Sequence, residues 1–189
     1  MLRFKRVTEL AHYYVGLTLK EGDDAVDATS GNGYDTIFLA QKVGSMGHVY
    51  AFDIQKEALE RTGEVLVRAA LRDRVTLIHA GHERMKEFID KPVMVVMFNL
   101  GFLPGYARNI STVFDSTLSA IQHSLSLLAP GGIVTVVLYP GHAEGRNEKE
   151  VLLPFCRELL SSDYTVLHTV LHNQHHDPPE LIVIQKTCH

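Results

Sequence analysis

The segment from Val26 to Thr36 constrains the fold of this chain more than any other, because a short apolar strand ends in an acid and runs into a glycine turn. Gly31 and Gly33 can adopt backbone angles that other residues avoid, and they let main-chain N–H groups approach a ligand closely. From Tyr34 onward the apolar spacing is typical of a helix. The pattern predicts a binding loop between the strand and the helix.

A dinucleotide-binding loop also places glycines after a first strand, so the details of this segment have to separate two classes of ligand. Thr36 stands where the dinucleotide motif has its third glycine, which disfavours the close approach of a pyrophosphate. Asp27 at the end of the strand repels a phosphate and attracts a cationic or zwitterionic ligand. The loop therefore favours S-adenosylmethionine (SAM), and NAD is the weaker alternative.

A second acid follows the loop at the spacing of a ribose-binding carboxylate. The strand His48–Asp53 ends in Asp53, twenty positions after Gly33. Its carboxylate can accept both hydroxyl hydrogens of a ribose. Asp53 can instead cap the following helix, which Ile54 and Gln55 open. Because Asp53 follows the glycine loop at this spacing, we predict that it binds the ribose of the cofactor.

Strands and helices alternate along the chain, which predicts an α/β fold with a parallel sheet and right-handed crossovers. The predicted helices run over Thr8–Leu19, from Tyr34 to about Val43, from Ile54 to about Ala70, from a cap at Ser111 to Leu128, and onward from a cap at Asn147. The predicted parallel strands are 24–28, 48–53, 75–80, 93–98 and, after a turn at 129–132, 133–139. Tyr164–His172 and Leu181–Gln185 predict a closing antiparallel hairpin. The expected sheet therefore has seven strands, is mostly parallel and carries helices on both faces.

Size and composition limit the alternatives. The 189 residues, 46% of them hydrophobic, suffice for one compact domain spanning 1–189. The apolar runs are too short to cross a bilayer and no signal peptide is indicated, so we expect a cytoplasmic protein without a membrane partner. Two cysteines indicate neither a disulfide framework nor a cysteine zinc site. A net charge of -4 argues against broad adhesion to nucleic acid but leaves a local contact open.

Six segments resemble motifs of known proteins, namely 27–36, 52–55, 99–105, 128–132, 139–142 and Pro178–Pro179. They resemble class I SAM-dependent methyltransferases and, more narrowly, the YtqB-like family of methylases, and the resemblance covers nearly the whole chain. It implies a Rossmann-like fold and SAM as the cofactor. The implied cofactor contacts are Asp27, Thr29, Gly31, Asn32, Gly33, Asp35, Thr36, Asp53 and Gln55. The resemblance also implies a tRNA methyltransferase that methylates the amine of 5-aminomethyl-2-thiouridine at the wobble position.

The residues after strand 93–98 are candidates for aligning that amine. Methyl transfer from a sulfonium is an in-line displacement, so the protein mainly has to align an unprotonated amine with the methyl carbon. The side-chain carbonyl of Asn99 can accept an amine hydrogen, and the backbone carbonyls of Leu100 and Gly101 can accept another. Phe102 can stack on the base or on the sulfonium.

The same segment also has a purely structural interpretation. Asn99 can cap a turn after a strand. The segment resembles the Asn-Pro-Pro-Tyr loop of amino methyltransferases but departs from it, because Leu100 and Gly101 replace the prolines and Phe102 lacks a hydroxyl. An extra hydrogen bond from position 102 is therefore excluded.

Three further candidates lie at predicted strand ends. Tyr139 ends strand 133–139 and His142 comes just after it, on the rim where ligands collect in open parallel sheets. His142 can assist deprotonation of an ammonium. His82 follows strand 75–80 and can border the adenine, although both histidines can also be loop residues that face water. The catalytic candidates are therefore Asn99, Phe102, Tyr139 and His142, and both Asn99 and His82 are candidates for the cofactor site.

Eleven histidines raise the question of a metal site. The densest group is His172, His175, His176 and Asp177, and such side chains can bind zinc. The group has no cysteine partner and no strict spacing, so we predict no metal.

The expected partner is tRNA, recognised through its anticodon arm, and two copies of the chain are expected to share that arm as a homodimer. Two alternatives stay open within the same fold. The protein can be a SAM-dependent methyltransferase of a small-molecule amine or of rRNA. It can also be a nucleotide-binding module without turnover, in which case cofactor binding is indifferent to Asn99.

Overall fold

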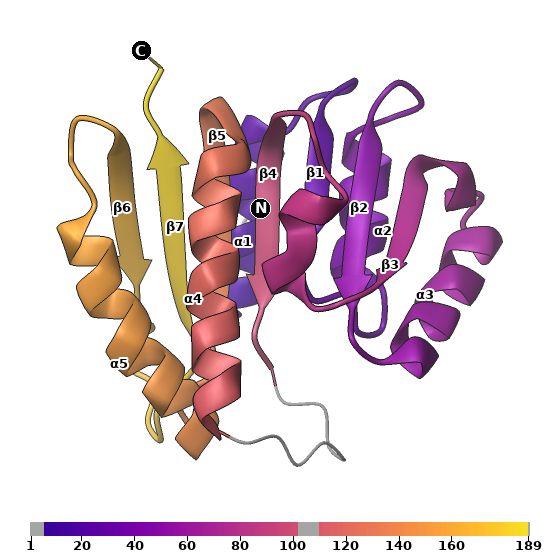
Figure 1. Ribbon diagram of the computed structural model, residues 1–189. Coiled ribbons are helices and arrows are strands. Elements are labelled where there is room, and N and C mark those ends of the chain that lie inside the picture. The colour runs from indigo at the N-terminus through magenta and orange to yellow at the C-terminus, as the bar shows by residue number, and fades with distance from the viewer. Residues whose placement is uncertain (1–5, 102–109, 189) are drawn as a thin grey trace.

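One seven-stranded sheet forms the centre of the molecule (Figure 1). The structure is a computed structural model that describes residues 6–101 and 110–188, without the side chains of residues 110–115. The strand order is β3-β2-β1-β4-β5-β7-β6. The strands are β1 (Asp24–Asp27), β2 (His48–Asp53), β3 (Val75–His79), β4 (Val93–Asn99), β5 (Leu128–Leu138), β6 (Tyr164–Thr169) and β7 (Glu180–Lys186).

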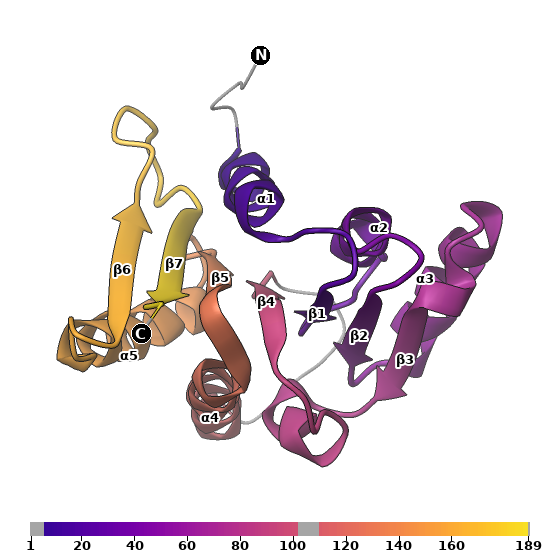
Figure 2. The same ribbon diagram turned by 90° about the horizontal axis from the view of Figure 1, so that it is seen from above.

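Helices cover both faces of this sheet. One face carries α1, α2 and α3, and the other carries α4, α5 and the 3-10 helix η2 (Figure 2). Their bounds, with a second 3-10 helix, are α1 (Val7–Thr18), α2 (Tyr34–Lys42), α3 (Lys56–Arg68), η1 (Arg72–Arg74), η2 (His82–Glu87), α4 (Ile110–Leu127) and α5 (Ala143–Glu158). No helix in the described chain is both long and apolar enough to span a bilayer.

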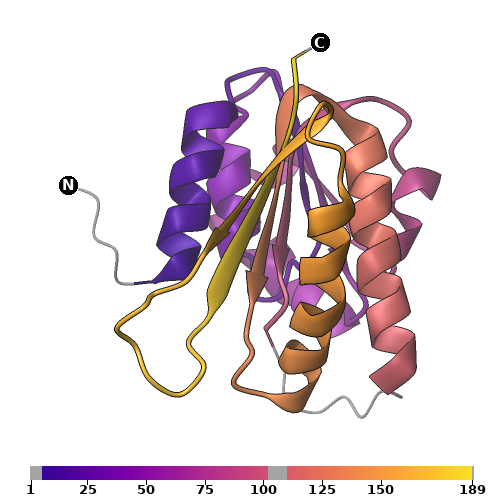
Figure 3. The same cartoon turned by 90° about the vertical axis from the view of Figure 1, so that its left-hand side faces the viewer.

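Strand β4 shows why the sheet needs both layers. Val96 and Phe98 belong to one buried apolar cluster, whereas Val95 and Met97 belong to the other. A strand that is apolar on both sides gains free energy only when both of its faces are covered. Figure 3 shows the sheet nearly edge-on between the two helical layers.

The predicted topology is confirmed. Strands β1 to β5 pair in parallel, and β7 pairs antiparallel with both β5 and β6. The carboxyl ends of β1, β2, β4 and β5 therefore lie along one edge of the sheet, at the bottom of Figure 1. This is the edge at which open parallel sheets bind ligands.

The turn predicted at 129–132 is wrong, because strand β5 already begins at Leu128. Leu128 pairs with Val93, and the register then shifts before Val95 pairs with Ile133. Gly131, with a φ of +79°, supplies the conformation for this irregularity. The hairpin strand β6 is also shorter than predicted and ends at Thr169, just before the turn in which Gln174 N donates to Leu171 O.

Both predicted caps on the second helical face are also wrong. Helix α4 begins at Ile110, so Ser111 lies inside it. Helix α5 begins at Ala143 and already contains Asn147, and His142 occupies its N-cap position. The sequence AEG at 143–145 gives no obvious start signal. The helix can begin there because Gly145 fits against the end of β5, where an added Cβ would lie 2.1 Å from the carbonyl oxygen of Tyr139.

Candidate active site

A cavity of about 440 Å³ lies at the carboxyl edge of the sheet. Its volume falls in the range of small-molecule sites. The loops after β1 to β5 build the wall together with parts of α4 and α5. The predicted site residues in this wall are Thr29, Gly31, Asn32, Asp35, Asp53, Gln55, His82, Asn99, Tyr139 and His142. Asp27, Gly33 and Thr36 do not line the cavity, and Phe102 lies outside the described residues.

The glycine loop has the backbone that its sequence predicts. Gly31 has a φ of +53° and Gly33 a φ of +81°. An added Cβ at Gly33 would lie 3.0 Å from both Thr62 Oγ1 and Val65 Cγ2 of helix α3, so the loop and this helix pack closely. Ser30 N donates to Phe52 O at 2.9 Å, which ties the loop to strand β2. The loop is therefore held in its conformation by the protein itself.

Asp27 is buried behind this loop, and its side chain does not line the cavity. Its side chain is fully buried, accepts a hydrogen bond from Thr36 Oγ1 and accepts a second from Thr29 N at 3.1 Å. Burial, and next the negative charge of Asp35, raise the pKa of Asp27 to about 7, against the lowering effect of these hydrogen bonds. Asp27 and Thr36, both predicted as cofactor contacts, are therefore fully buried beneath the loop and do not line the cavity.

Asp53 links the glycine loop to the start of helix α3. Gly31 N donates to Asp53 Oδ2 and Gln55 N donates to Asp53 Oδ1, both at 2.9 Å. A carboxylate oxygen has two lone pairs, so each oxygen can accept a further hydrogen bond. Asp53 also lines the cavity. Its position and its remaining lone pairs suit the two hydroxyls of a ribose.

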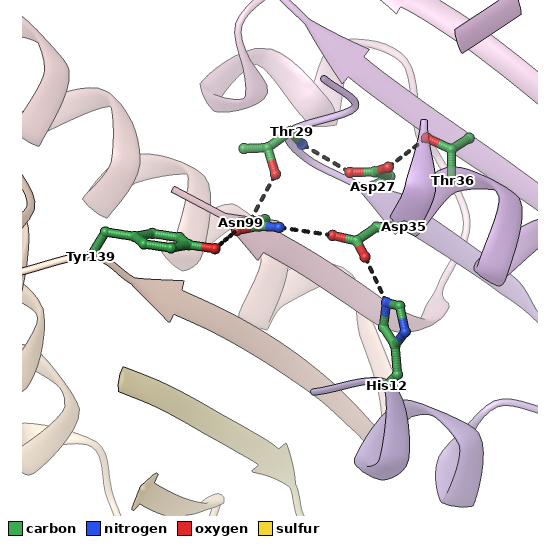
Figure 4. Close-up of polar contacts among 7 residues, drawn as sticks. All are labelled: His12, Asp27, Thr29, Asp35, Thr36, Asn99 and Tyr139. Atoms are coloured by element: carbon green, nitrogen blue, oxygen red, sulfur yellow. Dashed lines mark hydrogen bonds and ion pairs between the residues drawn. The ribbon is translucent and has the colours of Figure 1, made fainter. Parts of the chain in front are cut away.

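Asn99 stands at the centre of a hydrogen-bond network that joins four elements (Figure 4). Its backbone N–H donates to Thr29 Oγ1 at 2.8 Å, and its Nδ2 donates to Asp35 Oδ2 at 3.2 Å. Tyr139 Oη donates to Asn99 Oδ1 at 2.9 Å. Because the Asp35 carboxylate can only accept hydrogen bonds, the side-chain NH₂ of Asn99 must face Asp35, and the side-chain carbonyl oxygen then faces Tyr139. One lone pair of that oxygen stays available for a substrate hydrogen.

His12 on α1 extends this network and is not among the predicted site residues. A hydrogen bond of 2.6 Å joins His12 Nε2 to Asp35 Oδ1, and the imidazole stacks on Phe38 with 4.0 Å between ring centroids. Asp35 therefore receives His12 on one oxygen and Asn99 on the other. His12 lies inside an ordinary amphipathic helix, and no motif in the sequence singles it out.

The far wall of the cavity comes mainly from α4, from α5 and from the end of β5. His142 and Glu144 are exposed, whereas Glu148 is buried and accepts a hydrogen bond from Thr117 Oγ1 on α4 at 3.5 Å. These two helices were predicted, but their contribution to the site was not. On the other side, a 3.1 Å hydrogen bond joins His82 Nδ1 to Ala28 O, so His82 lies against the loop.

The charge of the wall selects among ligands. Its described residues include five carboxylates, on Asp35, Asp53, Glu83, Glu144 and Glu148, and no Lys or Arg. Such a cavity attracts cations and repels a diphosphate. This observation favours a sulfonium-bearing cofactor over NAD, as the loop sequence does. Within the described residues, no group of three His, Cys, Asp or Glu side chains is arranged to hold a metal ion.

The sequence is similar to that of known methyltransferases. A family model described as "Putative rRNA methylase" matches residues 49–185. The chain is 40% identical over 170 residues to "tRNA (mnm(5)s(2)U34)-methyltransferase, chloroplastic" of Arabidopsis thaliana, with 85% of this chain aligned. The match spans only 62% of the length of that relative.

Solved structures match the whole sheet. A "putative rRNA-methylase" from Clostridium thermocellum is 45% identical, covers 98% of this chain and 100% of its own, and has a TM-score of 0.92. A "putative methyltransferase" from Streptococcus mutans, solved in complex with SAH, is 34% identical, covers 97% of this chain and 99% of its own, and has a TM-score of 0.85. The family model matches well over half of the chain and agrees with these structures, so the chain belongs to the family described as "Putative rRNA methylase", with a Rossmann-like class I methyltransferase fold.

Proposed function

We propose that this protein is a SAM-dependent N-methyltransferase that converts the 5-aminomethyl group of the wobble (2-thio)uridine of tRNA to 5-methylaminomethyl. The observation that carries the proposal is the orientation of Asn99 at the wall of an anionic cavity, where its Nδ2 donates to Asp35 and its Oδ1 accepts from Tyr139. The name of the Arabidopsis thaliana relative supports the choice of RNA and nucleoside. The catalytic unit of the proposal is a single domain, 1–189.

The residues of the wall fit SAM. Asp53 presents acceptor oxygens for the ribose, and the loop from Thr29 to Asn32 borders the same space. When bound, SAM supplies an electrophilic methyl group. The streptococcal relative was solved with SAH, which supports this assignment.

The protein then has to position the amine. Asn99 Oδ1 accepts one hydrogen of the amine and thereby orients the nitrogen lone pair. The exposed Tyr34 lies at the mouth of the cavity and offers a ring on which a base can stack. Leu100 and Gly101 line the cavity next to Asn99, where their backbone carbonyls suit a second amine hydrogen. The chain itself contributes no covalent intermediate.

The proposal includes a homodimer that shares one anticodon arm. An apolar groove runs on the outer surface between α1 and the hairpin of β6 and β7, lined by Tyr14, Leu17, Ile133, Leu167 and Val183 with three polar neighbours. Leu17 is 65% exposed and Leu167 is 45% exposed, and exposed apolar surface of this kind is typical of interfaces. Light scattering that finds only monomer at assay concentrations would contradict the dimer. The cytoplasmic location stays a prediction.

Methyl transfer into tRNA tests the function. Labelled SAM is incubated with the protein and with bulk tRNA from cells that lack its gene, and the nucleosides are then separated and identified by mass. We expect label in 5-methylaminomethyl-2-thiouridine, lost with Asn99→Ala. Label in rRNA alone, or in a small amine without tRNA, would replace the tRNA proposal with that alternative. SAM binding without transfer to any acceptor would indicate a binding module.

A further inference from the structure

Glu148 occupies an unusual position in the far wall of the cavity. It is buried, with 6% of its surface exposed, yet it lines the cavity. Gly145 lies one helical turn before it on the same face of α5 and is pressed against the carbonyl of Tyr139. Because Tyr139 also holds Asn99, the close approach of α5 brings Glu148 into the wall that the proposed amine-binding residue shares.

No described cation balances the charge of Glu148. None of the ion pairs in the described chain includes it, and the neighbouring Lys149 binds Glu180 at 2.6 Å. Its partner is the Thr117 hydroxyl at 3.5 Å, at the long end of the range for a hydrogen bond. Burial of a carboxylate without a cation is costly. Burial, and to a smaller extent the charge of Glu144, raise the pKa of Glu148 to about 7, although the Thr117 hydroxyl opposes the shift.

The other carboxylates of the wall are less suited to receive a cation. Asp35 accepts hydrogen bonds from His12 and Asn99, and Asp53 accepts them from two backbone N–H groups. Glu83 is only half-buried and Glu144 is exposed, so water screens the charges of both. Glu148 therefore combines deep burial, access to the cavity and a weak internal partner.

We propose that Glu148 binds the ammonium form of the substrate's aminomethyl group and removes one of its protons before methyl transfer. This assignment rests on the proposed function, in which the acceptor is a primary aliphatic amine. Such an amine is mostly protonated near neutral pH and has no lone pair for attack until a proton leaves. An ammonium also supplies the positive charge that Glu148 lacks within the described chain.

The proton moves from the substrate ammonium to Glu148 within the enzyme–substrate complex. One ammonium N–H bond breaks, its electron pair remains on nitrogen, and the proton forms an O–H bond with a carboxylate oxygen of Glu148. The substrate becomes a neutral amine whose lone pair is free, and Asn99 Oδ1 can accept one of its remaining hydrogens. The proton on Glu148 later leaves to water through the open cavity.

Several titratable and charged groups near Glu148 can also influence the pH dependence of methyl transfer. On its own helix these are Glu144 and His142, the latter at the N-cap, together with Lys149, whose charge Glu180 of β7 neutralises. The same cavity is lined by Tyr139 just after β5, by Asp35 and Asp53 on the glycine-loop side, and by His82 and Glu83 of η2, while the Thr117 hydroxyl of α4 donates to Glu148.

The test compares Glu148→Gln with wild type in single-turnover methyl transfer to anticodon stem-loops that carry 5-aminomethyl-2-thiouridine. At pH 7 we expect roughly 100-fold slower transfer with unchanged SAM affinity. The wild-type rate should level off above pH 7, whereas the variant rate should continue to rise as more of the amine loses its proton in solution. Glu150→Gln, on the exposed side of the same helix, is the matched control and should behave as wild type.

Two readouts without SAM separate this role from a structural one. Wild type should bind the aminomethyl stem-loop more tightly than one with plain uridine, and Glu148→Gln should lose most of that preference. Wild type should also lose stability relative to the variant as pH rises from 4.5 to about 7, because the folded state holds the Glu148 proton more tightly than the unfolded chain.

A variant that keeps the wild-type rate and pH profile overturns the assignment of Glu148 while the proposed function stands. Wild-type protein that methylates no aminomethyl RNA contradicts the proposed function, and this inference falls with it.

Discussion

The two walls of the cavity differ in how completely they satisfy their own polar groups. The loop wall, residues 28–35 with 53–55, binds its two carboxylates, Asp35 and Asp53, through two hydrogen bonds each. The helix wall, residues 116–117 and 139–148, leaves Glu148 with one long hydrogen bond. Carboxylates that already accept hydrogen bonds hold the loop wall in one conformation before the cofactor binds. In the helix wall, Glu148 retains lone pairs for the ammonium that we propose it binds.

The largest effect is expected at Asn99, which joins the two walls. Asn99→Ala should slow methyl transfer roughly 100- to 1,000-fold, because the amine loses its orienting acceptor. The affinity for SAM should change only a few-fold. Single-turnover rates and a SAM titration measure the two quantities separately.

Tyr139→Phe is a milder change than Asn99→Ala, because it removes only the hydroxyl that donates to Asn99. We expect a loss of roughly 10-fold in rate. Should Asn99→Ala weaken SAM binding as strongly as it slows transfer, Asn99 would belong to the loop wall, and the division between the walls would fail.

Asp53 should show the opposite pattern. Asp53→Ala removes the proposed ribose acceptor and the partner of Gly31 N, so the dissociation constant of SAM should rise roughly 30-fold, or ~2 kcal/mol. At saturating SAM the transfer rate should recover. The exposed Asp73 gives a control, since Asp73→Ala removes the same charge far from the cavity. Equal effects of the two variants would mean that Asp53 acts only through net charge.

A substitution at Thr36 tests whether the hydrogen bond to buried Asp27 stabilises the loop wall. Thr36→Val removes the hydroxyl that donates to buried Asp27 and should destabilise the fold by about 2 kcal/mol at pH 8.5, where Asp27 is ionised. At pH 5.5 the loss should be smaller, because Asp27, with a pKa of about 7, is then protonated. Urea denaturation at both pH values measures this difference.

The raised pKa of Asp27 also sets the direction in which the stability of the wild-type protein changes with pH. The folded pKa of Asp27 exceeds its ordinary value of 3.8, so its contribution to stability falls as pH rises from about 4 to about 7. Thr36→Ser keeps the hydroxyl and should retain most of the stability. A pH-independent loss in Thr36→Val would point to packing in place of the hydrogen bond.

The smallest effect is expected at His12, which reaches Asn99 only through Asp35. His12→Ala should slow methyl transfer about 5-fold, because Asp35 loses one of its two donors and Asn99 is held less firmly. His12→Gln retains a donor and should restore part of the rate. A fall in SAM affinity at constant rate would assign His12 to the loop wall alone.

The sequence was informative where function depends on neighbouring residues. Gly31 and Gly33 predicted the loop because their positive φ angles are a local property of the backbone. The positions of Asp53 and Asn99 at the cavity followed because parallel strands align their carboxyl ends. The same local logic did not reveal that the side chain of Asp27, at the end of its strand, is fully buried.

By itself, therefore, the sequence determined the alternating fold, the glycine loop and the strand-end residues, since all three depend on short-range periodicity. The tertiary structure alone decided that His12 from α1 supports Asp35, and that Gly145 lets α5 bring Glu148 into the cavity wall. Both contacts join segments far apart in the chain, so no local pattern records them. Only the packing of helices against the sheet brings these side chains together.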